Sequence, residues 1–117
     1  MPSPEFVEAV LAVVERIPEG KVMTYGDVAW AIGSEAPRAV GRVMALYGHA
    51  VPWWRVVPVS GFPPQGHARL AIAHYLEEGT PLRPDAEAAA ASPDSYRIAL
   101  SSARLSYDHE IYQKAKS

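Results

Sequence analysis

Cysteine is absent from this chain of 117 residues. The protein therefore has no disulfide bonds, no thiolate metal ligands and no thiol nucleophile. A membrane span is missing as well, because no apolar run approaches the ~20 residues that cross a bilayer. The N-terminus has no basic stretch followed by an apolar core, which is the pattern of a secretory signal. We expect a soluble, cytoplasmic protein without membrane contacts.

The four histidines are not spaced like metal ligands. His49, His67, His74 and His109 form no recognisable ligand pattern with one another or with carboxylates. His67 and His74 are seven positions apart and can share one helical face, but no third ligand accompanies them. We expect no metal and no cofactor.

The chain also lacks excess positive charge, since its formal net charge is −2. Most DNA-binding proteins use Lys and Arg to contact the phosphates. The charges are not evenly distributed along the chain. From Lys21 to Arg69 the chain has five basic and two acidic residues. Charge by itself still fits an ordinary mixed surface better than a nucleic-acid interface. The length suits one hydrophobic core and one domain.

Capping residues and apolar spacing predict two helices in the first third of the chain. Ser3 and Pro4 form an N-cap and first turn, and apolar residues then recur at helical spacing over residues 4–17. Thr24 and Asp27 resemble a capping box that begins a helix over residues 25–32. Gly33 suits the left-handed position after its end.

A third helix follows, with Ser34 as its expected cap and Pro37 in its first turn. Its apolar face consists of Val40, Val43, Met44 and Tyr47. Arg38, Arg42 and Ala45 then point outward. Two short helices joined by a glycine turn indicate a helix-turn-helix, although many such pairs never contact DNA. We predict a small, mainly α-helical domain.

The second half of the chain is less regular. Residues 51–64 read as an irregular wall of the core, and a helix is expected over residues 69–78 with Ile72, Tyr75 and Leu76 inward. After Arg83 the composition shifts to an alanine run and then an apolar, tyrosine-containing tail. We divide the chain into a domain of residues 1–83 and a C-terminal extension of residues 84–117, packed on the domain or partly flexible.

Four motifs in the same order resemble the O6-alkylguanine-DNA alkyltransferases. Pro52-Trp53-Trp54-Arg55-Val56 is similar to the active-site motif Pro-Cys-His-Arg-Val of that family. The run from Ile17 to Gly26 resembles its Ile-Pro-x-Gly-x-Val-x-Thr-Tyr-Gly motif before the helix-turn-helix. Arg38-Ala39-Val40-Gly41 resembles its recognition helix, and Glu78-Gly79 the pair that ends its domain. The likeness covers about residues 4–82 and implies the family's helix-turn-helix, winged-helix-like fold.

Two substitutions within the active-site motif separate this chain from the enzymes of the family. Trp53 stands at the position of the nucleophilic cysteine and Trp54 at that of the activating histidine. An indole neither deprotonates usefully nor attacks carbon, so only Glu78 remains of the catalytic set. Residues 61–66 look shorter than the corresponding loop, which leaves its lesion contacts unassigned, and residues after Pro84 have no counterpart. We expect the non-enzymatic, alkyltransferase-like branch.

The resemblance implies binding to double-stranded DNA through the minor groove and rotation of an O6-alkylguanine out of the stack. The implied DNA-binding residues are Thr24, Tyr25, Arg38, Ala39, Gly41 and Arg42. Arg38 would fill the gap left by the base, and small residues beside it would allow close approach. Each has an ordinary alternative: Tyr25 packing its helix turn, Arg38 solvated, Gly41 packed against another helix.

The implied lesion pocket contains Tyr25, Trp53 and Val56, the last through its main-chain carbonyl. If the stretch is extended, adjacent side chains point to opposite faces, which places Trp53 at the pocket and Trp54 inward. The alternative is that both tryptophans are core residues. Arg55 is expected to brace the segment.

The resemblance further implies a monomer, associated with the nucleoid when bound, that flags lesions for nucleotide excision repair proteins. The tail is one candidate docking surface, and deleting residues after Arg83 should then spare lesion binding but weaken the coupling to repair. Two alternatives from other classes remain. One is a sequence-specific helix-turn-helix transcription regulator that binds as a dimer. The other is an enzyme with Glu78 or a histidine as base.

Overall fold

Helices dominate the computed structural model, which describes residues 2–113. The helices are α1 (Pro4–Arg16), α2 (Tyr25–Ala31), α3 (Pro37–Tyr47), α4 (Ala68–Glu78), α5 (Ala86–Ala91), α6 (Leu100–Ala103) and α7 (Glu110–Gln113). Two 3-10 helices, η1 (Gly48–Ala50) and η2 (Trp53–Arg55), lie between α3 and α4. This confirms the predicted mainly helical domain with a helix-turn-helix, formed by α2 and α3. No helix within residues 2–113 is long and apolar enough to cross a membrane.

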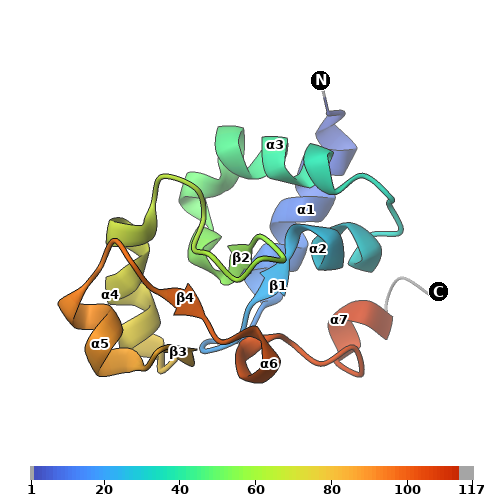
Figure 1. Ribbon diagram of the computed structural model, residues 1–117. Coiled ribbons are helices and arrows are strands. Elements are labelled where there is room, and N and C mark those ends of the chain that lie inside the picture. Colours follow the sequence, from blue (N-terminus) through green and yellow to red (C-terminus); the bar gives the residue numbers. More distant parts are fainter. Residues whose placement is uncertain (1, 114–117) are drawn as a thin grey trace.

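Two short strand pairs connect the helices. Strands β1 (Met23–Thr24) and β2 (Val56–Val57) pair in parallel, with Met23 opposite Val56. Strands β3 (Leu82–Arg83) and β4 (Arg97–Ile98) pair antiparallel. Figure 1 shows α1, α2 and α3 on one side of the β1–β2 pair and α4, α5 and the β3–β4 pair on the other. The β1–β2 pair therefore brings the tryptophan-containing segment next to the start of α2.

Local capping explains where α1 and α2 begin and where α2 ends. Phe6 N–H donates to Ser3 Oγ at 3.1 Å, and the predicted capping box of α2 is confirmed, with Asp27 N–H donating to Thr24 Oγ1 at 3.0 Å. Gly33 has a φ of 75°. Ser34 does not cap α3, because the N-cap is Ala36, which has no side-chain cap. Ser34 Oγ instead accepts from Ala36 N–H, since it lies two positions too early to reach the first turn.

The apolar faces of α3 and α4 agree with the sequence except at their ends. Val40 and Val43 are fully buried, and Arg38, Arg42 and Ala45 are exposed, as predicted. Tyr47 was expected inward but is 41% exposed, because the last turn of α3 extends past the core. Leu76 is 39% exposed for a different reason: it lies about 100° around the helix from Tyr75, which is fully buried.

Residues after Arg83 complete both hydrophobic clusters of the core. Tyr96, Ile98 and Ala103 join the cluster around α4, while Leu105, Ile111 and Tyr112 join the cluster around α1, α2 and α3. Val22 N–H also donates to the Ala103 carbonyl at 2.9 Å, and Leu105 N–H to the Val22 carbonyl at 2.9 Å. Removing these residues would expose both clusters. The expectation that a deletion after Arg83 spares lesion binding is therefore withdrawn.

Candidate nucleic-acid interface

A cavity of about 760 Å³ opens between α3, the segment that contains η1 and η2, and the start of α4. Its walls are Tyr25, Gly41, Met44, Ala45, Gly48, His49, Trp53, Pro58, Pro64, Gln65, His67 and Leu70. We refer to this cavity as the α3 pocket. Its lining is mostly apolar or aromatic, with a few polar groups, which is the usual make-up of a small-molecule site.

Tyr25 lies in the wall of the α3 pocket at the first position of α2. Burial raises the pKa of its hydroxyl, so this group stays protonated and can donate a hydrogen bond. Within residues 2–113 the hydroxyl has no hydrogen-bond partner. Thr24, predicted as a DNA-binding residue, is itself buried, and its hydroxyl is engaged in the α2 cap. Thr24 therefore fixes the start of α2 and, with it, the position of Tyr25 at the pocket.

Gly41 faces the same pocket from α3, where a glycine costs about 1 kcal/mol of helix stability relative to alanine. A methyl group at this position would have Tyr25 Cδ1 as its nearest neighbour, at 4.0 Å. That distance is ordinary van der Waals contact. Close helix packing therefore does not require glycine here.

Trp53 and Trp54 diverge, but not because the segment is extended. They lie in η2, so the prediction of an extended stretch was wrong, although the 3-10 turn also separates adjacent side chains. Trp53 lines the α3 pocket with its ring 5.4 Å from that of His67. Trp54 turns away and stacks on His74, with ring centroids 3.6 Å apart and planes 7° from parallel.

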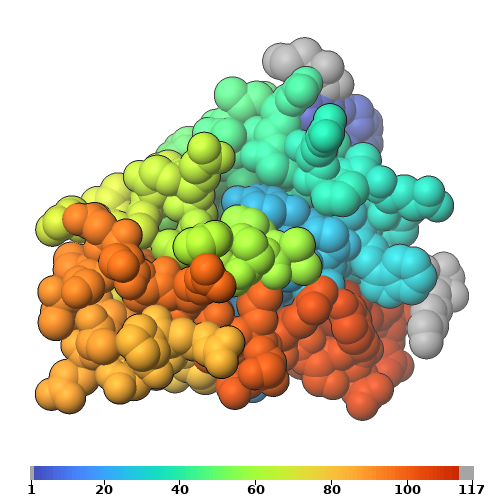
Figure 2. All heavy atoms as spheres, in the orientation of Figure 1, coloured from blue at the N-terminus to red at the C-terminus, as the bar shows by residue number. Residues whose placement is uncertain are grey.

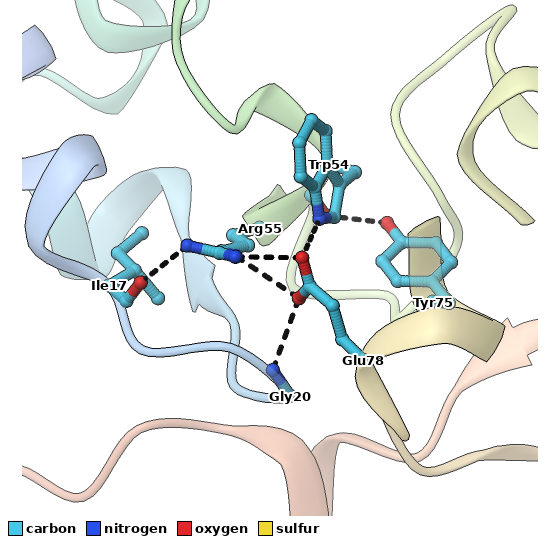
Figure 3. Close-up of polar contacts among 6 residues, drawn as sticks. All are labelled: Ile17, Gly20, Trp54, Arg55, Tyr75 and Glu78. Atoms are coloured by element: carbon cyan, nitrogen blue, oxygen red, sulfur yellow. Dashed lines mark hydrogen bonds and ion pairs between the residues drawn. The ribbon is translucent and has the colours of Figure 1, made fainter. Parts of the chain in front are cut away.

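Glu78 accepts four hydrogen bonds, three of them from the η2 segment (Figure 3). Its carboxylate accepts from Trp54 Nε1 at 2.8 Å, from Arg55 Nε and Nη2 at 3.1 and 2.7 Å, and from Gly20 N–H at 3.1 Å. Arg55 also donates to the Ile17 carbonyl at 2.8 Å. Arg55 therefore braces the segment, as expected, and Glu78 joins α4, η2 and the turn after α1.

Competing effects act on the pKa of Glu78. Burial by itself would raise it, but the hydrogen bonds from Arg55, Gly20 N–H and Trp54 outweigh burial and hold the pKa below its ordinary value. A carboxylate so stabilised in its charged form is a weak proton acceptor. This arrangement suits a structural anchor and disfavours the alternative in which Glu78 acts as a general base.

The remaining predicted site residues lie outside the walls of the α3 pocket. Arg38 and Arg42 are exposed on α3, and Ala39 is half-buried beside them. Val56 is buried in β2 and pairs with Met23, so its side chain belongs to the core. A role for Val56 in ligand contact would have to involve its main chain.

Most of the pocket wall was not among the residues predicted from the sequence. Gly41, Met44 and Ala45 of α3 and Gly48 at its C-cap are spaced i, i+3, i+4 and i+7, so they follow one helical face that could have been found from Gly41. His67, Gln65 and Leu70 reach the pocket only through the path of the chain after β2, which has no such periodic signal. Among residues 2–113, no group of three or more histidine, aspartate or glutamate side chains could hold a metal ion.

The chain is similar to DNA-binding and base-flipping proteins. Residues 5–79 match the family model described as 6-O-methylguanine DNA methyltransferase, DNA binding domain. The DNA base-flipping protein of Escherichia coli is 49% identical over 55 residues, covering 44% of this chain and 43% of that protein. The DNA base-flipping protein of Vibrio parahaemolyticus is 37% identical over 60 residues, covering 49% of this chain and 60% of that protein. The matched regions thus span about half of these curated relatives.

The structure of S. pombe Atl1 in complex with damaged DNA containing O6-carboxymethylguanine has the same fold. It superposes with a TM-score of 0.72 at 27% identity, covering 91% of this chain and 99% of that chain. This coverage exceeds residues 1–83, so the likeness continues into the C-terminal extension, for which we expected no counterpart. With a family match over residues 5–79 and a tryptophan in place of the reactive cysteine, the chain belongs to the 6-O-methylguanine DNA methyltransferase DNA-binding domain family, in its alkyltransferase-like form.

Proposed function

We propose that this protein is a non-enzymatic sensor that binds O6-alkylguanine in duplex DNA, rotates the base out of the stack and holds it without repair. One observation carries the proposal: the position of the family's nucleophile is occupied by an indole that forms the wall of a 760 Å³ pocket beside the helix-turn-helix. The base-flipping relatives and the Atl1 complex with damaged DNA support the same function.

Base extrusion must be compensated by contacts in the pocket. Rotating a nucleotide out of the duplex costs a few kcal/mol. Stacking of the base on Trp53 offsets about 1–3 kcal/mol, and the Tyr25 hydroxyl can donate to the base. The planar guanidinium of exposed Arg38 would enter through the minor groove and fill the vacated space, with Ala39, Gly41 and Arg42 alongside. A main-chain contact from Val56 belongs to this proposal.

The alkyl group should stay on the DNA. Transfer needs a thiolate and a base to form it, and this chain offers Trp53 and Trp54 at those positions. Glu78 remains, but its carboxylate is engaged by Arg55 and by Trp54. A protein that holds a lesion without removing it must pass it to others, and we propose nucleotide excision repair proteins as the recipients.

In this proposal the protein works as a monomer in the cytoplasm and associates with the nucleoid when bound to DNA. Residues 1–83 carry the DNA-binding elements, and residues 84–117 are the extension, whose described part, residues 84–113, packs on them.

A titration of two matched duplexes, one with O6-methylguanine and one with guanine, tests the proposal. Tryptophan fluorescence at fixed salt reports binding, and digestion of the DNA afterwards counts methylated bases. We expect tighter binding to the lesion with every methyl group retained. Equal affinity for both duplexes would favour a sequence-specific transcription regulator, and methyl loss would indicate an enzyme.

A further inference from the structure

We infer that Arg83 and Arg97 form a second DNA contact, a phosphate-binding surface that lies outside the family match of residues 5–79. The two arginines line a groove of about 730 Å³ together with Phe62, Pro64, Gln65 and Tyr96. We refer to it as the β3–β4 groove. The inference rests on the proposed function, since it assigns this groove to the backbone of the same DNA.

The register of the β3–β4 pair places Arg83 and Arg97 directly opposite each other. Leu82 pairs with Ile98, and both side chains are buried. Arg83 and Arg97 form the next pair, so their side chains lie on the opposite face of the two strands. Both arginines are exposed. Like charges directly opposite in an antiparallel pair are destabilising. Within residues 2–113 neither arginine forms a salt bridge, so nothing in the described chain offsets that repulsion.

The surroundings orient this charge without neutralising it. The Arg97 guanidinium carbon lies 4.5 Å from the centroid of the Phe62 ring, an attraction that leaves the positive charge in place. Asp94 is the acidic residue in the groove wall. Its carboxylate is already bound by Arg69, which donates from Nη2 at 2.6 Å and from Nε at 3.2 Å. The groove therefore keeps the two uncompensated charges of Arg83 and Arg97.

Hydrogen bonds connect this groove to both ends of the segment 61–68, which contributes Pro64, Gln65 and His67 to the wall of the α3 pocket. Ile98 N–H donates to the Gly61 carbonyl at 2.7 Å, and the Tyr96 hydroxyl donates to the Ala68 carbonyl at 2.6 Å. Pro64 and Gln65 line both cavities, so one loop separates them. Figure 2 shows this yellow-green loop directly against the orange segment near residue 95.

A strand that delivers a base into the α3 pocket has to pass beside that loop. Duplex DNA carries one negative charge per ~1.7 Å of its axis, so any segment that reaches the groove presents phosphates. A guanidinium binds phosphate with two parallel hydrogen bonds, and paired arginines match successive phosphates better than a neutral surface would. The chemistry of the groove thus fits the backbone of DNA, and base identity would play no part.

The test is the salt dependence of DNA binding in the full-length chain. The variant Arg83→Gln/Arg97→Gln is compared with the wild type, with Arg83→Lys/Arg97→Lys and with Arg16→Gln. Arg16 lies on α1 beside Glu110, away from the groove, and serves as the control for loss of a positive charge elsewhere on the surface. Affinities for lesion and unmodified duplexes are measured from about 50 to 200 mM salt, with circular dichroism spectra and melting temperatures as folding controls.

We expect the glutamine variant to lose about 1.8 from the slope of log K against log salt, or about 0.9 for each phosphate contact. Both duplexes should be affected equally, the lysine variant should retain most of the slope, and Arg16→Gln should match the wild type. A wild-type slope in the folded glutamine variant, on either duplex, overturns the inference and would assign the groove to another partner, such as an acidic protein. Failure of the proposed function is seen separately, as equal wild-type affinity for the two duplexes.

Discussion

Arg104 donates from Nε and Nη2 to the two carboxylate oxygens of Asp27, at 2.9 and 3.0 Å, across 77 positions of sequence. The same carboxylate accepts from Thr24 N–H at 3.1 Å and from the Tyr107 hydroxyl at 2.7 Å. Asp27 is thus one half of the cap that begins α2 and also the attachment point of the C-terminal extension. The position of Tyr25 at the pocket depends on residues at the far end of the chain.

Replacing Arg104 with alanine should lower the free energy of unfolding by about 2–3 kcal/mol, because it leaves the Asp27 carboxylate buried without its main partner. The value is at the low end for a buried pair since the Arg104 side chain is 34% exposed. Arg104→Lys should lose less, and Tyr107→Phe about 1 kcal/mol. Urea denaturation provides the measurement. An alanine variant as stable as the wild type would show that the ion pair contributes nothing.

Acid should unfold the protein partly through Glu78. Its pKa is lowered in the folded state from an ordinary 4.5, so its contribution to stability is complete above that pH and is lost as the pH falls through the folded-state value. Burial would raise the pKa of Asp27 too, but hydrogen bonds from Arg104, Thr24 N–H and Tyr107 outweigh burial and lower this pKa in the folded state from an ordinary 3.8. Protonation of Asp27 therefore adds a further loss of stability in acid. Glu78→Gln should cost about 3 kcal/mol near neutral pH, because it leaves Arg55 without its charged partner.

The same variant should show a flatter dependence of stability on pH below about 4.5, since one of the titrating groups is gone. Glu77→Gln is the control, as this neighbouring carboxylate is exposed. Urea denaturation from about pH 7 to pH 2 gives both profiles. Parallel pH profiles for Glu78→Gln and the wild type would mean that Glu78 is not the acid-sensitive group.

The two adjacent tryptophans should have separable roles. Trp53→Ala should weaken binding to an O6-methylguanine duplex by about 10- to 100-fold, the loss expected from one stacking platform, with little change for unmodified DNA. Trp54→Ala should mainly lower stability, because the indole stacks on His74 and donates to Glu78. Binding titrations and thermal melts on both variants distinguish the roles. Equal loss of lesion selectivity in folded Trp53→Ala and Trp54→Ala would refute this separation.

Gly41→Ala should raise stability while impairing the site. Alanine is favoured over glycine inside a helix by about 1 kcal/mol, and the added methyl group meets only Tyr25 at an ordinary distance. The same methyl group projects into the α3 pocket, so affinity for the lesion duplex should fall. Thermal denaturation and fluorescence titration measure the two effects. A gain in stability with unchanged lesion affinity would return Gly41 to a purely structural explanation.

Local patterns predicted much of this fold because their causes lie within a few residues. The Thr24 and Asp27 box, the stop at Gly33 and the buried face of Val40 and Val43 depend on spacing along one helix. Ser34 failed as a cap because helix starts vary by a few positions, and Tyr47 because periodicity does not say where the core ends. The α3 pocket combines residues 25, 41, 53 and 67, whose proximity no local pattern contains.

The sequence by itself determined the family, through four ordered motifs, and the absence of the family's thiol nucleophile, through Trp53 and Trp54, because residue identity alone decides whether a thiol exists. The tertiary structure decided which residues share a cavity, that Glu78 is an anchor and that Arg104 closes the cap of α2. These are contacts between distant positions, whose geometry is set by how both hydrophobic clusters pack together.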